Sequence, residues 1–140
     1  MIEESEVKDL FVKIEINRQS EISDVRENVN NSTIVDFNSH IFVELRNMSK
    51  EALEQSRITI KVLEKAYFKD AMLGQFEFDF NHLYFMENHT WPHFWVALTN
   101  PESEDYSEIN GYLKMSASCY GADDAPTELK EDENDEDGEI

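Results

Sequence analysis

The runs RITIKVLEK (residues 57–65) and DAMLGQFEFDF (residues 70–80) decide the fold class of this chain. In the first run Ile58, Ile60 and Val62 are apolar and the residues between them are polar. The second run repeats this alternation, because acidic residues separate its three phenylalanines. Apolar residues at every second position are typical of strands with one buried and one solvated face. We therefore predict two β-strands, with one buried face formed by Phe76, Phe78 and Phe80.

Further segments of the chain have the β-branched and aromatic composition that favours strands. They are DLFVKIEIN (9–17), a weaker polar segment (21–29), HIFVEL (40–45), HFWVALTNPES (93–103) and NGYLKMSASCY (110–120). Between them, Met48 to Gln55 favours a short helix with Ser49 as its N-cap. Seven strands separated by turns predict an all-β fold, an antiparallel β-sandwich.

Length and charge restrict the class of protein. The chain has 140 residues, 40% of them hydrophobic, and a formal net charge of −19. The length predicts one domain with a real core, and the charge argues against nucleic acid as a partner. The single cysteine, Cys119, leaves no intrachain disulfide and is expected to be a small core residue. The acidic N-terminus is no signal peptide, and no apolar run approaches the roughly 20 residues of a membrane span.

The negative charge is concentrated in the last part of the chain. The last stretch, GADDAPTELKEDENDEDGEI (121–140), has ten acidic residues and one lysine, a net charge of −9, which leaves −10 for residues 1–120. Such a tail repels itself and lacks apolar residues for a core. We predict a disordered start at residues 1–6, the β-sandwich domain at 7–122, and a disordered acidic tail or linker at 123–140.

The order of several motifs resembles a C2 domain of the ferlin family, most closely the second C2 domain of those proteins. The resemblance covers about residues 7–140 and is more specific after residue 30. The stretches that carry it are NNSTIVDFNSHIFVEL (30–45), RITIKVLEKAYFKDAMLGQFEFDFNHLY (57–84), HTWPHFWVALTNPES (89–103) and GYLKMSASCYGADDAP (111–126), followed by the acidic tail.

One departure from the family concerns its strands. The resemblance implies an eight-stranded C2 sandwich, but the family's first strand has no counterpart before DLFVKIEIN. We therefore expect a C2-like sandwich that lacks its first strand. Either the chain is a segment of a larger ferlin-like protein, or something else fills that place in the sheet. An unfilled place would leave backbone groups and apolar side chains exposed.

A second departure concerns metal binding. By the resemblance, residues 63–70 correspond to the third calcium-site loop of C2 domains. Glu64 and Asp70 match its first and last acidic positions, whereas Ala66 stands where a middle aspartate is needed. Because Ca²⁺ takes several oxygen ligands at once, we expect a weak, degenerate Ca²⁺ site at Glu64 and Asp70, and no certain cofactor.

The same loop is the candidate membrane or partner loop. Tyr67 and Phe68 lie between Lys65 and Lys69. In a docking loop, such an aromatic pair inserts at the level of the lipid headgroups while the lysines meet anionic lipid. The simpler interpretation is that the two aromatic side chains cover one end of the sandwich.

The residues do not indicate an enzyme. His89 and His93 are four residues apart, but Pro92 lies between them in a segment that we interpret as a loop. No HExxH, GxSxG or glycine-rich phosphate motif is present. We expect Trp95 in the core, whereas Trp91 fits a core position and a binding anchor equally well. The histidines, which we expect to be loop or surface residues, are His40, His82, His89 and His93.

The resemblance implies a non-enzymatic role in membrane or vesicle trafficking or fusion, through contacts with phospholipid or with another protein. On this hypothesis the domain is peripheral to the membrane at its cytoplasmic face. The larger parent protein would be anchored by a segment that is not present here. The alternative is a protein–protein interaction module without lipid or Ca²⁺ binding, which would use an unpaired sheet edge.

Overall fold

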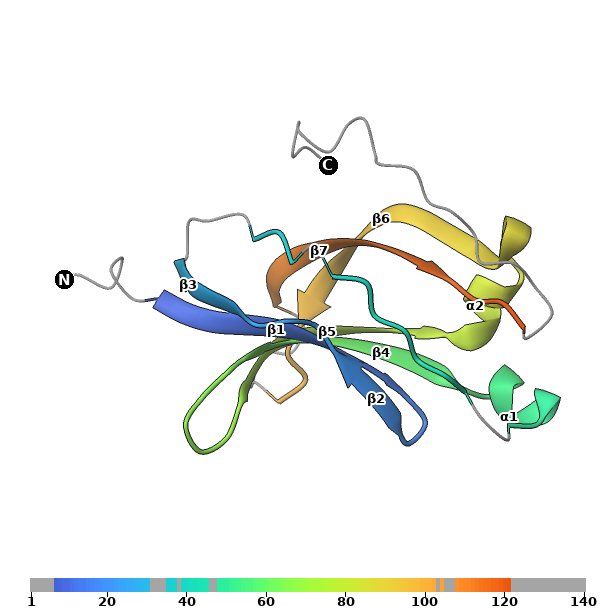
Figure 1. Ribbon diagram of the computed structural model, residues 1–140, viewed down its shortest axis with the longest axis horizontal. Coiled ribbons are helices and arrows are strands. Elements are labelled where there is room, and N and C mark those ends of the chain that lie inside the picture. Colours follow the sequence, from blue (N-terminus) through green and yellow to red (C-terminus); the bar gives the residue numbers. More distant parts are fainter. Residues whose placement is uncertain are drawn as a thin grey trace.

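The computed structural model describes residues 7–30, 35–37, 39–45, 48–102, 104 and 108–121. The predicted start at 1–6 and the tail at 123–140 lie outside these residues. Along the described part, short helices separate antiparallel strands (Figure 1). The elements are β1 (Val7–Ile16), β2 (Gln19–Ile22), β3 (Arg26–Asn30), α1 (Lys50–Glu54), β4 (Arg57–Glu64), β5 (Ala71–Asp79), α2 (Phe80–Tyr84), η2 (Glu87–His89), β6 (Thr90–Thr99) and β7 (Ile109–Ser118).

Antiparallel pairing links the strands in the order β2-β1-β4-β5-β6-β7, and β3 also pairs with β1. The β1–β4 and β4–β5 ladders are long, whereas β5 meets β6 only where Gln75 pairs with Thr99. The sheet folds back at this junction, so that β6 and β7 form a second layer over β1, β4 and β5 (Figure 1). This arrangement confirms the predicted all-β class and is consistent with a C2-like β-sandwich.

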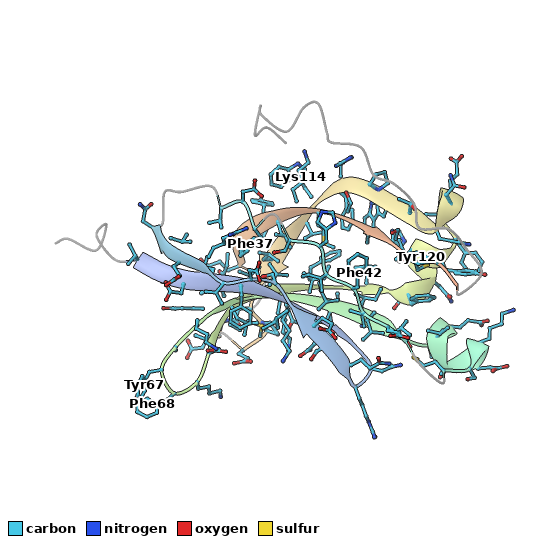
Figure 2. The ribbon with its side chains drawn as sticks, in the orientation of Figure 1. Phe37, Phe42, Tyr67, Phe68, Lys114 and Tyr120 are labelled. Carbon is cyan, nitrogen blue, oxygen red and sulfur yellow. The ribbon has the colours of Figure 1, made fainter. Side chains whose placement is uncertain are left out.

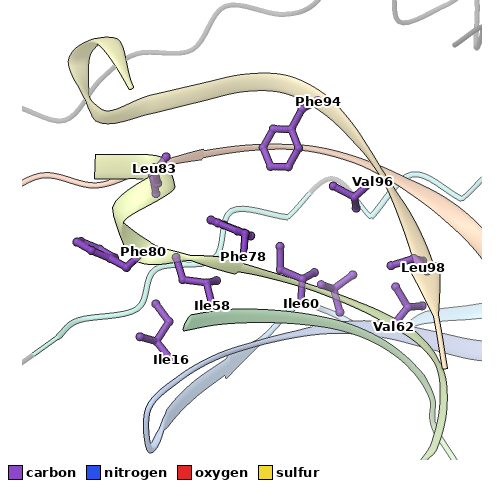
Figure 3. Close-up of a cluster of buried hydrophobic side chains, with 11 residues drawn as sticks. Ile16, Ile58, Ile60, Val62, Phe78, Phe80, Leu83, Phe94, Val96 and Leu98 are labelled. Carbon is purple, nitrogen blue, oxygen red and sulfur yellow. The ribbon is translucent and has the colours of Figure 1, made fainter. Parts of the chain in front are cut away.

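The core lies between the two layers (Figure 3). Every second residue of β4 enters it, and Ile60 is the most enclosed, with 1% of its surface exposed. Phe78 and Phe80 are buried and Phe76 packs against them, which confirms the predicted phenylalanine face. The buried cluster consists of Val12, Ile16, Ile58, Ile60, Val62, Phe78, Phe80, Leu83, Phe94, Val96 and Leu98.

Gly74 permits the close crossing of β5 and β6. A Cβ atom placed on Gly74 would lie 2.8 Å from Cβ of Leu98 and 3.3 Å from its carbonyl carbon. Real Cβ atoms essentially never approach a neighbour so closely, and here the neighbour includes backbone. Because glycine has no Cβ atom, the two layers can approach closely at Gly74, where the sheet folds back.

The weak segment at 21–29 forms two short strands instead of one, and both pair with the same edge of β1. Ser23 lies between them and is buried. Its Oγ accepts a hydrogen bond from the Val12 amide at 2.8 Å, and its own amide donates to the Val12 carbonyl at 2.8 Å. The Ser23 side chain thus replaces a ladder bond where the pairing passes from β2 to β3.

The strand predicted at residues 40–45 is wrong, because residues 39–45 join no ladder. The segment still alternates: Ile41, Val43 and Leu45 pack against the core, and Phe42 is 72% exposed. Apolar contact with the core accounts for the alternation in the sequence. A ladder also requires a neighbouring strand, and within the described residues no strand pairs with this segment.

The predicted core position of Trp95 is also wrong. A register shift between Trp91 and Phe94 turns both of those rings inward, where they stack with centroids 3.6 Å apart. Trp95 then faces outward, half-buried, with the Lys114 ammonium 5.8 Å from its ring centroid. Cys119 is partly buried and packs against the core.

The predicted short helix is confirmed as α1. Ser49 is its N-cap, with Oγ accepting a hydrogen bond from the Ala52 amide at 3.1 Å. The helix has no fully buried residue, although Leu53 packs against the core, and its cap satisfies a backbone amide of the first turn.

Replacing Gly74 with alanine should lower the free energy of unfolding by about 1–3 kcal/mol, because the added methyl group overpacks the junction of the layers. Urea titration followed by circular dichroism measures the change. Gly111→Ala is the matched control, since nothing lies within 4 Å of a Cβ atom at that position. Equal losses for the two variants would contradict this account.

Candidate functional site

Residues 65–70 form the loop that connects β4 to β5, at the end of the molecule opposite α1 and α2 (Figure 1). Hydrogen bonds close the base of this loop. The Lys65 amide donates to the Asp9 carbonyl at 2.7 Å, and the Ala66 amide donates to Oδ1 of Asp70 at 3.0 Å. The base is therefore joined to β1 and to itself, while the tip extends beyond the sandwich.

Tyr67 and Phe68 form the tip of the loop and point away from the sandwich (Figure 2). Their exposed fractions are 93% and 94%, and their rings meet edge to face with centroids 4.7 Å apart. The two side chains therefore do not cover the end of the sandwich. Two adjacent, solvent-exposed aromatic rings form an apolar patch whose burial against another surface would be favourable.

Lys65 and Lys69 flank the aromatic pair, and both are exposed. The described residues provide no ion-pair partner for either ammonium group. The loop tip thus combines two apolar rings with two cations, although the chain as a whole carries −19.

The two carboxylates predicted to be metal ligands are both engaged with protein groups. Glu64 lies 3.9 Å from the Lys8 ammonium, and Asp70 accepts the Ala66 amide described above. Ca²⁺ takes six to eight oxygen ligands, often several from carboxylates, and these two side chains offer few. In the described part of the chain, no group of three or more His, Cys, Asp or Glu residues is placed to hold a metal ion.

An open depression of about 470 Å³ lies beside the base of the loop. Glu102, on the segment after β6, reaches this depression because Asn100 fixes its position. The Asn100 side-chain amide donates to the Met72 carbonyl at 3.1 Å, and the Glu102 amide donates to Oδ1 of Asn100 at 2.9 Å. The lining residues are Lys61, Leu63, Lys69, Asp70, Ala71, Met72 and Glu102.

Lys61 belongs to an ion-pair network on the outer face of the sheet. Its ammonium lies 3.0 Å from Glu15, which also pairs with Lys13 at 3.3 Å. Partial burial of Glu15 acts to raise its pKa, but hydrogen bonds and charge from Lys61 and then Lys13 outweigh burial and lower the pKa of this carboxyl. Because Lys61 is held in an ion pair with Glu15, Lys69 is the lining cation that has no ion-pair partner among the described residues.

The structure does not bring the histidines together as a catalytic or metal site. His89, in η2, stacks on Tyr84 with centroids 4.4 Å apart, and His82 meets the ring of Trp91 at 4.7 Å. His93 lies in β6 and His40 in the segment that joins no ladder. Sequence reasoning missed Glu102 and Met72, because no local motif indicates that the segment after β6 meets the base of the loop.

A second surface is the outer edge of β7 in the upper layer, with which no strand of the described residues pairs. β7 pairs with β6 and ends the strand order, and residues 39–45 join no ladder. Apolar residues of both segments contact the core and remain partly exposed. In the described part of the chain, no helix is long and apolar enough to span a membrane.

The comparisons with known proteins point to one family. The chain matches no family model. It is 29% identical over 134 residues to Ferlin 2 of Tetrahymena thermophila. This alignment covers 91% of this chain and 8% of that protein. It is 28% identical over 104 residues to Myoferlin of Xenopus tropicalis, covering 74% of this chain and 5% of that protein. This weak similarity over most of the chain suggests a ferlin-like C2 domain, which spans less than a tenth of the length of either relative.

The double variant Tyr67→Ala/Phe68→Ala should keep the free energy of unfolding within about 0.5 kcal/mol of the original chain, because exposed side chains contribute little to stability. Urea titration at neutral pH is the measurement. Ile60→Ala, in the most enclosed position, should lose about 2–5 kcal/mol in the same assay. A comparable loss in the loop variant would show that the aromatic pair has a structural role.

Proposed function

We propose that this ferlin-like C2 domain contacts phospholipid through the loop at residues 65–69, as the peripheral module of a larger protein in membrane trafficking or fusion. The single observation that carries the proposal is the nearly complete exposure of Tyr67 and Phe68 between two lysines. The role is binding rather than catalysis. By its similarity to the ferlins, the domain would act at the cytoplasmic face of a membrane, with the anchor elsewhere in the parent protein.

The expected energies favour membrane contact by the loop over electrostatic repulsion between the acidic chain and a negatively charged membrane. Two aromatic side chains of about 150–250 Å² each gain at most roughly 8–12 kcal/mol on burial, and association consumes a large part of this gain. A surface at about −30 mV costs roughly 0.7 kcal/mol per negative charge brought against it. Since charges beyond about 8 Å are screened at physiological salt, only the loop end of the sandwich contributes, and there the lysines offset the acidic groups.

Vesicle sedimentation of the 140-residue chain tests this function. Phosphatidylcholine vesicles, with and without phosphatidylserine, should pellet the original chain, and Tyr67→Ala/Phe68→Ala should lower the partition coefficient by about tenfold or more, as expected for losing over 1.4 kcal/mol. Phe42→Ala is the control, because this ring is 72% exposed and lies away from the loop. If the original chain pellets with no vesicle, the lipid function is wrong.

We further propose that lipid contact does not require Ca²⁺. Glu64 is paired with Lys8, Asp70 binds the Ala66 amide, and Ala66 itself supplies no carboxylate. Two engaged carboxylates are a poor match for an ion that takes six to eight oxygens.

Millimolar Ca²⁺ should therefore leave vesicle partitioning and the amide ¹H–¹⁵N spectrum near residues 64–70 unchanged. The matched comparison is Ala66→Asp, which restores an acidic side chain in the middle of the loop and should make the same amides respond to Ca²⁺. A Ca²⁺-dependent shift in the original chain would overturn the proposal of a degenerate site.

A second candidate function is protein–protein contact by strand addition. The observation that favours it is the open ladder edge of β7, together with residues 39–45, which join no ladder. An added strand would gain main-chain hydrogen bonds and cover the partly exposed apolar side chains of both segments. Failure of the chain to pellet with any vesicle would favour this function over the first.

A further inference from the structure

The depression beside the loop carries exposed charges of both signs. Lys69 contributes an ammonium group, Asp70 and Glu102 contribute carboxylates, and Leu63 and Met72 are among the apolar residues of the lining. Lys61 also lines it, but its ammonium is held in an ion pair with Glu15 at 3.0 Å. The depression therefore presents one available cation beside two anions, rather than a cluster of positive charge.

The acidic groups have capacity for a ligand. Asp70 uses Oδ1 to accept a hydrogen bond from the Ala66 amide, which leaves its second carboxylate oxygen to contact a cationic group of a ligand. Glu102 is exposed, and its backbone is held by Asn100, which in turn is bound to the Met72 carbonyl. The position of Glu102 at the depression thus follows from a chain of hydrogen bonds through Asn100 to Met72.

The length of the loop places these charges at the outer surface of the lipid headgroup layer. Five residues, Lys65 to Lys69, reach out and return, so that the tip lies about 7–10 Å beyond the base. A bilayer's headgroup layer is about 5–7 Å thick on each side. When Tyr67 and Phe68 reach the hydrocarbon boundary, the depression at the base lies about 7–10 Å from that boundary, at the outer surface of the headgroup layer.

We propose that this depression binds a zwitterionic phospholipid headgroup, with Lys69 contacting the phosphate and Asp70 and Glu102 contacting the ammonium. The inference rests on the proposed lipid function and specifies its ligand. A headgroup with one charge of each sign satisfies both signs of the depression, whereas the additional carboxylate of phosphatidylserine would be repelled by Asp70 and Glu102. At low salt, where screening is weak, the net charge of −10 on residues 1–120 further disfavours an anionic surface.

Partitioning of the full 140-residue chain between buffer and vesicles tests the ligand class. Pure phosphatidylcholine vesicles should bind the chain, added phosphatidylserine should weaken binding at low salt, and sodium chloride should reverse that weakening by screening. Stronger binding to the phosphatidylserine vesicles would overturn the zwitterionic ligand and leave the lipid function intact. Absence of binding to both vesicles would instead overturn the lipid function itself.

Charge variants test the site. Lys69→Ala and Glu102→Gln should each lower partitioning on phosphatidylcholine by up to about fivefold, the size expected for an exposed ion pair. Lys50→Ala, which removes an exposed lysine on α1, should change nothing. Glu102→Lys should reverse the preference and favour vesicles with phosphatidylserine. Unchanged partitioning on phosphatidylcholine for Lys69→Ala, Glu102→Gln and Glu102→Lys would overturn the headgroup site.

Discussion

The packing of β4 and β5 against β6 is the contact on which the rest of this structure depends. Ile60 is enclosed at its centre, and Gly74 lets β5 cross within van der Waals distance of Leu98. Toward the loop, the buried cluster reaches Val62 on β4 and goes no further along the hairpin. The β4–β5 hairpin continues past that point, so within the described residues no opposing layer packs on Tyr67 and Phe68. The exposure of the loop is a consequence of where the core stops.

Period-two alternation allowed much of the fold to be predicted, because it records which face of a strand is buried. It predicted the phenylalanine face of β5 and the apolar face of β4, and helix composition with Ser49 predicted α1. Alternation does not record whether a partner strand is present, so residues 40–45 were predicted as a strand although they join no ladder. Nor does it reveal a register shift, and the one between Trp91 and Phe94 accounts for the position of Trp95.

The candidate site was predictable only where its residues are contiguous. Lys65, Tyr67, Phe68 and Lys69 were identified from the loop sequence, since flanking lysines around an aromatic pair are a local pattern. Glu102 was not, because it reaches the loop through Asn100 and the Met72 carbonyl, a contact between segments about thirty residues apart. The charge balance of the depression therefore follows from tertiary structure, whereas the apolar tip follows from local sequence.

The central claim is that the loop at residues 65–69, and not the open edge of β7, is the surface that meets lipid. An amide ¹H–¹⁵N spectrum of the chain, recorded with and without phosphatidylcholine bicelles, tests it most directly because every backbone position reports separately. The account predicts line broadening and shifts confined to about residues 64–72 and Glu102, with β7 and residues 39–45 unchanged. Changes concentrated on β7 and residues 39–45, with an unaffected loop, would contradict it.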